Sequence, residues 1–444
     1  MSQNIPLFSM LSCFLLLWCF TAAQNFGRAQ LVYEWKWIDF DWPSAEDERN
    51  ARSNGSFVPE RNLFSGIKEY KGTIYISIPR RKWTAGQPVS LARVVTIDGL
   101  AKLRPYPNWT AQQQGDCAAL QFVQSMEIDP NTGFMYVIDT GRVGLSLNLC
   151  PAKLVVYDLK IDTQIDLYEF PTHVVSNTSN FLNDIVLDYV NGQVRYAYIT
   201  DTNDASIVVY DFHSRSSWKL KDPTMGMESN GTVITISGIQ YNFPIALNGI
   251  AMSPDFKYVY YCSLGGYNLY QIPTETLRNP GTSNSNGIRL LGKKVSQTDG
   301  MIHGSKFLYY GAVGLNAVYF WNATKDMAEM NVGIGVVTLN TQTELIRNDS
   351  KLQWPSTFAF DDQGWLWIAC NRLQVFWNAD NPPDDGEAYM RIWKVYVNET
   401  GYLYQAHKIE QGKSDGSTLT SSTTDVDCFV FLSVMFLCCL KGYY

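Results

Sequence analysis

One three-strand pattern recurs six times along the chain, and this repetition limits the possible folds more than any other feature of the sequence. Each copy has an apolar strand followed by an acidic or glycine turn, then a tyrosine-rich strand, a loop and a third apolar strand. The second strands are Ile74–Ile78, Met135–Asp139, Ala197–Asp201, Tyr258–Tyr261, Phe307–Tyr310 and Leu366–Ala369. Their spacing of roughly 50 to 60 residues is typical of propeller blades, whose radial repetition protects the sheet edges. The sequence therefore predicts an all-β fold, a six-bladed β-propeller.

The composition agrees with a large all-β unit. Of the 444 residues, 46% are hydrophobic, 14% aromatic and 17% charged, which excludes global disorder. Aromatic residues favour strands over helices, and no segment shows a sustained apolar helical stripe with caps. We therefore expect one propeller domain over residues 24–411. The segment 31–60, which precedes the first copy, is expected to close the ring by pairing with the last blade.

The two ends of the chain fall outside the repeats. Residues 1–23 are typical of a signal peptide, because the apolar stretch Leu7–Phe20 precedes small residues and is shorter than the roughly 20 residues of a membrane span. Residues 412–444 form a low-complexity tail with a short apolar end. This tail is either a GPI-anchor signal or an artefactual or alternative terminus. We expect a secreted, extracellular protein, attached to a membrane only if the tail is a GPI signal.

Cysteines and glycosylation sequons also indicate an extracellular protein. Outside the two ends, four cysteines remain: Cys117, Cys150, Cys262 and Cys370. An even number of widely spaced cysteines predicts two disulfides, with three possible pairings. The lack of a C-x-x-C pair argues against zinc or redox chemistry. Sequons that predict N-glycosylated surface loops occur at Asn54, Asn108, Asn177, Asn230, Asn322, Asn348 and Asn398.

Several function classes are disfavoured by the sequence. The net charge is −7 and the isoelectric point about 5.2, without the basic stripe of a nucleic-acid-binding protein. Gly412–Gly416 matches G-x-S-x-G by letter but lies in the tail, and Gly287–Lys293 begins like a P-loop but continues with Lys294 instead of Ser or Thr. The four histidines have no metal-ligand spacing. We expect no cofactor, no metal and no nucleic acid.

Polar residues recur where the first strand of several copies begins. Side chains at such positions in successive blades can converge on one axial cavity. Their chemistry suits an aromatic amine, because a carboxylate can bind the ammonium, Asn and Thr the ring hydroxyls, and Phe358 can stack on the ring. The alternative is that the Asn-Gly and Asp-Gly pairs simply make turns. The candidate ligand-binding residues at these positions are Asn183, Asn248, Thr298, Asp299, Thr357 and Phe358, with Asp184 beside Asn183. Asn371, which follows the second strand of the sixth copy, is a further candidate.

A calcium site is a further alternative for the same axis. Leu247–Asp255 resembles calcium-dependent lactonase propellers, in which Asn and acidic residues surround a central metal with oxygen ligands. Asn183, Asn248 and Asp299 would then be the ligands. Lys68 stands near the place in the first copy where an acidic ligand would be needed, and this disfavours the metal.

A series of motifs in order resembles the family of Yellow and major royal jelly proteins. The motifs are Val32–Phe40 with Trp42-Pro43, Pro105–Trp109 leading to Asp116-Cys117, Ile138–Arg142, Cys150–Leu154, Ser296–Gly300, Trp354–Phe358 and Asn371–Gln374. Together they cover nearly everything from residue 31 to about residue 404. The resemblance implies a six-bladed propeller with two disulfides, Cys117–Cys150 and Cys262–Cys370.

The members of this family differ in function. The resemblance implies secreted insect proteins linked to cuticle pigmentation and melanin formation, among them dopachrome-converting enzymes, salivary traps for biogenic amines, and nutritional proteins. Together with the residues above, it predicts a secreted binder of a small catechol or indole amine in insect melanin or amine-handling pathways. Two alternatives stay open: a tautomerase-type enzyme that converts dopachrome, with Asp299 or Asp184 as base, and a structural or nutritional protein without a ligand.

Overall fold

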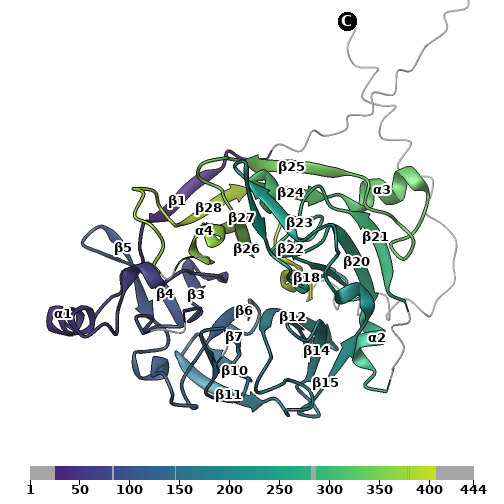
Figure 1. The fold of residues 1–444 in the computed structure, drawn as a ribbon. Coiled ribbons are helices and arrows are strands. Elements are labelled where there is room, and N and C mark those ends of the chain that lie inside the picture. Colours follow the sequence, from purple (N-terminus) through teal and green to yellow (C-terminus); the bar gives the residue numbers. More distant parts are fainter. Residues whose placement is uncertain are drawn as a thin grey trace, which may run out of the picture.

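The computed structural model describes residues 26–82, 85–145, 147–281, 287–377, 379 and 381–406. The expected signal peptide and the tail from residue 412 lie outside the described residues. Within the described part, the chain forms six four-stranded antiparallel sheets that surround a central axis as blades (Figure 1). This arrangement confirms the six-bladed β-propeller predicted from the repeats.

The blades follow one another in chain order, and the first-named strand of each blade is the innermost. Blade 1 has β2 (Ile67–Tyr70), β3 (Thr73–Ser77), β4 (Leu91–Ile97) and β5 (Leu100–Pro105). Blade 2 has β6 (Val123–Asp129), β7 (Phe134–Asp139), β10 (Lys153–Asp158) and β11 (Thr163–Glu169), and blade 3 has β12 (Leu182–Val190), β13 (Gln193–Asp201), β14 (Ser206–Asp211) and β15 (Ser216–Lys221). Blade 4 has β18 (Leu247–Met252), β19 (Tyr258–Ser263), β20 (Asn268–Pro273) and β21 (Arg289–Lys293), and blade 5 has β22 (Met301–His303), β23 (Leu308–Ala312), β24 (Ala317–Trp321) and β25 (Gln342–Arg347). Blade 6 has β26 (Pro355–Phe360), β27 (Trp365–Asn371), β28 (Met390–Tyr396) and β1 (Gln30–Trp35).

The ring is closed by its N-terminal strand. Strand β1 is the outer strand of blade 6 and pairs antiparallel with β28, with Gln30 opposite Lys394 and Trp35 opposite Met390. Because the last blade combines one strand from the N-terminal end with three strands from the C-terminal part of the chain, opening the ring would break this strand pair. The predicted pairing of the segment after residue 30 with the last blade is confirmed.

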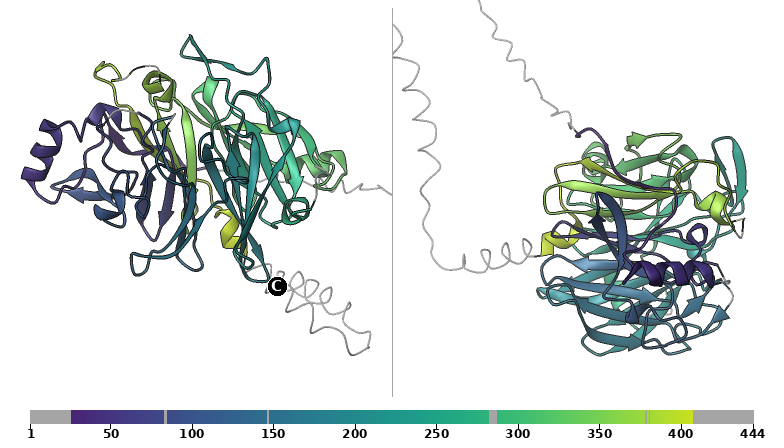
Figure 2. Two further views of the ribbon diagram at one scale, coloured as in Figure 1. Left: turned by 60° about the horizontal axis from the view of Figure 1, so that its bottom comes forward. Right: turned by 90° about the vertical axis from the view of Figure 1, so that its left-hand side faces the viewer.

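Short helices and two additional hairpins decorate the ring. The helices are α1 (Ala45–Ser53), α2 (Thr274–Arg278), α3 (Ala323–Met330) and α4 (Leu373–Trp377). The 3-10 turns are η1 (Pro59–Arg61), η2 (Thr110–Gln112), η3 (Pro223–Met225), η4 (Val313–Leu315) and η5 (Tyr402–Gln405), and the hairpins are β8 (Arg142–Val143) with β9 (Leu147–Asn148) and β16 (Val233–Ile236) with β17 (Ile239–Asn242). Helix α1 lies at the outer edge of the ring (Figures 1 and 2). No helix in the described ranges is long and apolar enough to cross a membrane.

The core lies between the blades. Tyrosines of the middle strands are fully buried there, as expected for aromatic residues that pack one blade against the next. Two of their hydroxyls bind buried carboxylates: Tyr198 Oη donates to Asp188 Oδ2 at 2.6 Å, and Tyr309 Oη donates to Glu399. The tyrosines therefore contribute to the interior of the fold and not to a ligand site.

The sequons lie at the surface of the ring. All seven asparagines, from Asn54 to Asn398, are half-buried or exposed. Several of these side chains fold back on the local backbone; for example, Asn108 Oδ1 accepts from Ala111 N at 3.0 Å. Glycosylation itself stays a prediction.

Only one of the two expected disulfides is formed among the described residues. Cys117 and Cys150 are bonded, with their Cα atoms 5.3 Å apart. The expected Cys262–Cys370 bond is wrong, because both residues are separate buried thiols. Cys262 is in β19 of blade 4 and Cys370 in β27 of blade 6, so blade 5 lies between them, whereas a disulfide needs Cα atoms within about 4.4–6.8 Å.

The single bridge gives a prediction. Replacing Cys117 by serine should lower the free energy of unfolding by about 2–4 kcal/mol, because the bond restricts the unfolded chain. Denaturant unfolding measures this loss, and the exposed Ser350→Ala, which removes no disulfide bond, is the control. Non-reducing peptide mapping should recover the Cys117–Cys150 peptide and unlinked peptides for the other two thiols. A linked Cys262–Cys370 peptide would contradict the assignment.

Candidate functional site

A cavity lies on the propeller axis at one face of the ring. We call this side the upper face: it carries the loops that lead into the inner strands and those that join the second strand of a blade to the third. The cavity, here the axial chamber, has a volume of about 160 Å³, and a cavity of roughly this size can hold one aromatic ring. Its lining residues are Arg81, Gln124, Arg142, Leu145, Phe181, Asn183, Thr202, Asn203, Ile245, Asn248, Leu264, Asp299, Leu373 and Trp377.

The polar floor of the chamber is built by irregularities in the inner strands. In β6, β12, β18 and β26 the pairing register shifts at the polar pair, between Val123 and Ser125, Leu182 and Ile185, Leu247 and Ile250, and Pro355 and Thr357. Such bulges turn side chains out of the regular alternation, so these polar residues face the axis. The Asn248-Gly249 pair therefore lies within a strand and does not make a turn. Gly300 is needed because a Cβ there would lie 2.2 Å from Ser356 O of the next blade.

The floor residues form a chain of hydrogen bonds from blade to blade. Gln124 Nε2 donates to Ser65 Oγ at 2.8 Å and to Asn183 Oδ1 at 3.2 Å. Asn183 Nδ2 donates to Asn248 Oδ1, and Asn248 Nδ2 donates to Asp299 Oδ1 at 2.8 Å. Because the amide and carboxylate oxygens here are occupied by N–H donors, they are not arranged as a set of free metal ligands.

Asp299 ends this chain and has its own donors. Its Oδ2 accepts from Trp354 Nε1 at 2.7 Å and from Ser356 Oγ at 2.6 Å, in addition to Asn248 at Oδ1. Burial raises the pKa of Asp299, while these donors and the charge of Arg81 favour the carboxylate. The side chain thus joins blades 4, 5 and 6, with three of its acceptor positions filled from within the protein.

Two arginines give the chamber a positive wall. Arg81 donates from Nη2 to Ser65 Oγ at 2.8 Å and to Gln124 Oε1 at 3.2 Å. Arg142 donates to the carbonyl of Leu145 in the β8–β9 hairpin. Both are buried, with exposed fractions of 6% and 2%, and burial lowers the pKa of each, for Arg81 to about 10.

A recess of about 20 Å³ lies next to the floor and contains Asp184. Asp184 Oδ1 accepts from Ser125 Oγ at 2.8 Å and from its neighbour Ile185 N at 2.9 Å. Burial raises the pKa of Asp184 to about 7, against the lowering effect of the nearby positive charge of Lys68. A carboxyl group with a pKa near neutrality can both accept and donate a proton.

Lys68 supplies a fixed cation near the axis. Its Nζ lies 3.1 Å from Glu127 Oε2, and both side chains are almost completely buried. Glu127 Oε2 also accepts a hydrogen bond from Tyr402 Oη at 3.5 Å. Tyr402 belongs to η5, a turn near the centre of the lower face (Figure 2). The lower half of the axis is thus filled by paired charges and a tyrosine, and the open chamber lies at the upper end.

The sequence-predicted site residues divide into two groups. Asn183, Asn248 and Asp299 line the chamber, and Asp184 and Thr357 line the recess with Asn183 and Asp299. Thr298 is fully buried and lines neither.

Phe358 and Asn371 have different positions from those expected. Phe358 was expected to stack on a ligand, but it is 2% exposed and packs in the core between blades 5 and 6, because the regular part of β26 turns it away from the axis. Asn371 donates to Phe64 O at 3.0 Å and accepts from Leu373 N at 3.0 Å. It therefore positions α4, which places Leu373 and Trp377 in the chamber wall, without lining the chamber itself.

Sequence reasoning missed the residues that come from upper-face loops. Arg81, Arg142, Phe181 and Trp377 lie outside the inner strands, in segments whose length differs from blade to blade. One signal was present: Arg80 and Arg81 follow an apolar strand in a chain with few charges. Arg80 is a structural counterpart, since its guanidinium is fully buried and donates to backbone carbonyls such as Leu120 O at 2.8 Å.

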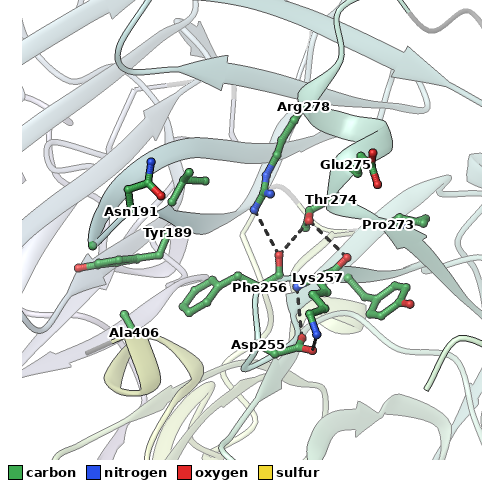
Figure 3. Close-up of a pocket in the computed structure, with 13 residues that line it drawn as sticks. Tyr189, Asn191, Asp255, Phe256, Lys257, Pro273, Thr274, Glu275, Arg278 and Ala406 are labelled. Atoms are coloured by element: carbon green, nitrogen blue, oxygen red, sulfur yellow. Dashed lines mark hydrogen bonds and ion pairs between the residues drawn. The ribbon is translucent and has the colours of Figure 1, made fainter. Parts of the chain in front are cut away.

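A second cavity, of about 420 Å³, lies on the lower face between blades 3 and 4 (Figure 3). Arg278 extends over it, but this guanidinium donates to both oxygens of Asp188 at 2.7 Å and to Phe256 O at 3.3 Å. Lys257, at its edge, lies 3.6 Å from Asp255. Because the arginine and the lysine of this cavity are already paired within the protein, we place the candidate site at the axial chamber.

Comparison with known proteins gives a family match and two kinds of relatives. The family model described as Major royal jelly protein matches residues 121–401. Protein yellow of Drosophila yakuba is 24% identical over 378 residues, which cover 80% of this chain and 66% of that protein. The chain thus spans slightly less than two thirds of that relative. Dopaminechrome tautomerase of Drosophila melanogaster is 25% identical over 402 residues, covering 85% of this chain and 83% of that protein.

Solved structures are similar at a lower level. A luciferin-regenerating enzyme has a TM-score of 0.44 at 13% identity and covers 78% of this chain and 96% of its own. A nidogen/laminin complex has a TM-score of 0.40 at 14% identity, with 68% and 87% covered. At these values neither likeness bears on function.

Proposed function

Because the chain belongs to the major royal jelly protein family, whose model matches more than half of it, we propose that its axial chamber binds a small aromatic molecule of the catechol or indole type. The observation that carries the proposal is the chamber itself, which combines apolar walls with N–H donors at one place on the axis. Phe181, Ile245 and Trp377 can contact the faces of a ring, and Asn248 with the two arginines can donate to its oxygens.

The binding proposal gives a prediction for the aromatic wall. Replacing Trp377 by alanine should weaken the binding of ethylcatechol about 10-fold, because stacking and burial of one ring face are lost. Isothermal titration calorimetry measures the affinity, and Tyr396→Ala, an exposed position at the outer part of blade 6, is the control. Equal affinities of the wild type and Trp377→Ala for ethylcatechol would contradict the assignment of the chamber as the binding site.

A second function is favoured by one specific observation. Asp184 lies beside the floor of the chamber with a pKa near neutrality, and the relative that is 25% identical over 402 residues is named Dopaminechrome tautomerase. In a tautomerisation, a carboxylate takes a proton from a ring carbon, and a proton is returned to a ring oxygen or nitrogen without net oxidation. We therefore propose as the second candidate an isomerase for small quinoid aromatics, with Asp184 as the acid–base group.

We further propose that the protein is secreted and acts in melanin or amine-handling chemistry. The Cys117–Cys150 bond supports an oxidising compartment, since disulfides are rare in the cytosol. The expected signal peptide and glycosylation sequons support the same route. A downward mass shift of the purified protein after glycosidase treatment would test it, and an unchanged mass would argue against passage through the secretory pathway.

A further inference from the structure

The chamber carries more positive than negative charge on its lining. Among its described lining residues, Arg81 and Arg142 are the basic side chains and Asp299 is the acidic one. Behind the wall, Asp201 is close enough to Arg142 to favour its charged form. Asp201 Oδ1 accepts from Phe181 N at 2.8 Å and from Asp204 N at 3.3 Å, whereas its Oδ2 is a buried atom without a hydrogen-bond partner and lies outside the chamber lining. From below, the charges that face the floor are Asp184 and the Lys68–Glu127 pair.

Both arginines keep donors without partners. Within the described part of the chain, Arg81 Nε and Arg142 Nε are buried atoms with no hydrogen-bond acceptor. A buried guanidinium that lacks a full set of acceptors is costly, and a bidentate carboxylate is the partner that its planar donor fork fits. This incomplete pairing distinguishes them from Arg80 and Arg278, whose donors are taken up by carbonyls and by Asp188.

The chamber offers little to an ammonium group. Asp299, the carboxylate on its lining, already has three donors from Asn248, Trp354 and Ser356. Asp184 lies in the recess of about 20 Å³, which has space for one water that can relay a proton between Asp184 and the chamber but not for an alkylammonium group. A ligand ammonium in the chamber would therefore meet two guanidinium groups before it met a free carboxylate.

We propose that the chamber selects aromatic ligands that carry an anionic substituent, such as a carboxylate, over those that carry an ammonium. This inference rests on the proposed binding function. The ring lies between Phe181 and Trp377, and the anionic group pairs with Arg142 and Arg81. The substrate class is thus a catechol or indole acid, in contrast to the amine expected from the sequence.

Three ligands with one catechol ring test the proposal: dihydrocaffeate as the anion, ethylcatechol as the neutral compound and dopamine as the cation. In calorimetric titrations at neutral pH, we expect dihydrocaffeate to bind about 10- to 100-fold more tightly than ethylcatechol, as for a charge-assisted hydrogen-bonded pair. Dopamine should bind more weakly than ethylcatechol. Dopamine affinity equal to or above that of dihydrocaffeate, with ethylcatechol still bound, overturns this inference alone. No binding of any of the three overturns the proposed function and this inference with it.

Variants of the chamber arginines test which side chain causes the preference for anionic ligands. Arg142→Met should remove the preference for dihydrocaffeate, measured as the ratio of its affinity to the affinity for ethylcatechol in the same variant. Arg142→Lys keeps the positive charge and should retain part of the preference for dihydrocaffeate. This variant therefore still tests the role of Arg142 if the methionine variant does not fold. The matched control is Arg215→Met, which removes an exposed arginine from the turn between β14 and β15, where it pairs with Asp166. An unchanged preference in both Arg142 variants contradicts the assignment.

Discussion

Replacing Asp299 by alanine is expected to lower the free energy of unfolding by about 3–5 kcal/mol, the usual cost of removing one partner from a buried charged network. The change leaves Asn248 Nδ2, Trp354 Nε1 and Ser356 Oγ without their acceptor, and these donors come from blades 4 and 6. It also removes the carboxylate whose charge favours the buried cation of Arg81. Equilibrium denaturation in urea measures the loss.

Two further variants make this test specific. Asp299→Asn keeps the shape and one acceptor oxygen, so its loss should be smaller than that of the alanine variant. Asp349→Ala is the matched control, because this aspartate is exposed and lies outside the axis, and its unfolding free energy should change by less than about 0.5 kcal/mol. A loss below 1 kcal/mol for Asp299→Ala would mean that the axial chain of hydrogen bonds does not stabilise the ring. Such a result would instead favour a direct role of the Asp299 carboxylate in ligand binding.

The architecture could be predicted because it follows from local patterns that repeat. Each copy of the three strands buries its residues against the next copy, so the number of copies determines the number of blades. The position of the site was also predictable in part. Asn183, Asn248 and Asp299 stand at equivalent places in the copies and do meet at the axis.

The direction of individual side chains could not be predicted, because it depends on bulges. A shift of one residue in register turns a side chain to the other face of the sheet. In β26 the shift falls between Pro355 and Thr357, so Thr357 lines the recess and Phe358 packs in the core. Sequence alternation alone does not indicate at which residue the shift occurs.

Contacts between distant loops were a further limit. The walls of the chamber come from the β8–β9 hairpin, from α4 and from the loop that contains Arg81, and no repeat relates these segments. The Cys262–Cys370 pairing failed for a related reason. Counting four cysteines does not reveal that two of them lie in blades that are not neighbours.

For the isomerase candidate, replacing Asp184 by asparagine should reduce the turnover of dopaminechrome about 100- to 10,000-fold, the range contributed by a positioned acid–base group. The amide is nearly isosteric and can keep the contact with Ser125, so the chamber should still bind its ligand. Because the pKa of Asp184 is about 7, the carboxylate that acts as base forms as pH rises through 7, and wild-type turnover should rise with it. Absorbance-monitored conversion, corrected for the rate in buffer, gives both results.

The free energy of unfolding should fall with rising pH, whereas turnover should rise. Measuring both therefore distinguishes an effect of Asp184 on catalysis from its effect on folding. The folded protein holds the Asp184 proton up to about pH 7, whereas the unfolded chain releases it near the ordinary value of 3.8. The contribution of this group to stability therefore falls as pH rises between these values, and Asp184→Asn removes that slope.

Lys68→Met should shift the rise in turnover to higher pH, since the cation that favours the carboxylate is lost, and the exposed Lys71→Met should not. Turnover that survives unchanged in Asp184→Asn would assign any conversion to another group and leave the chamber as a binding site.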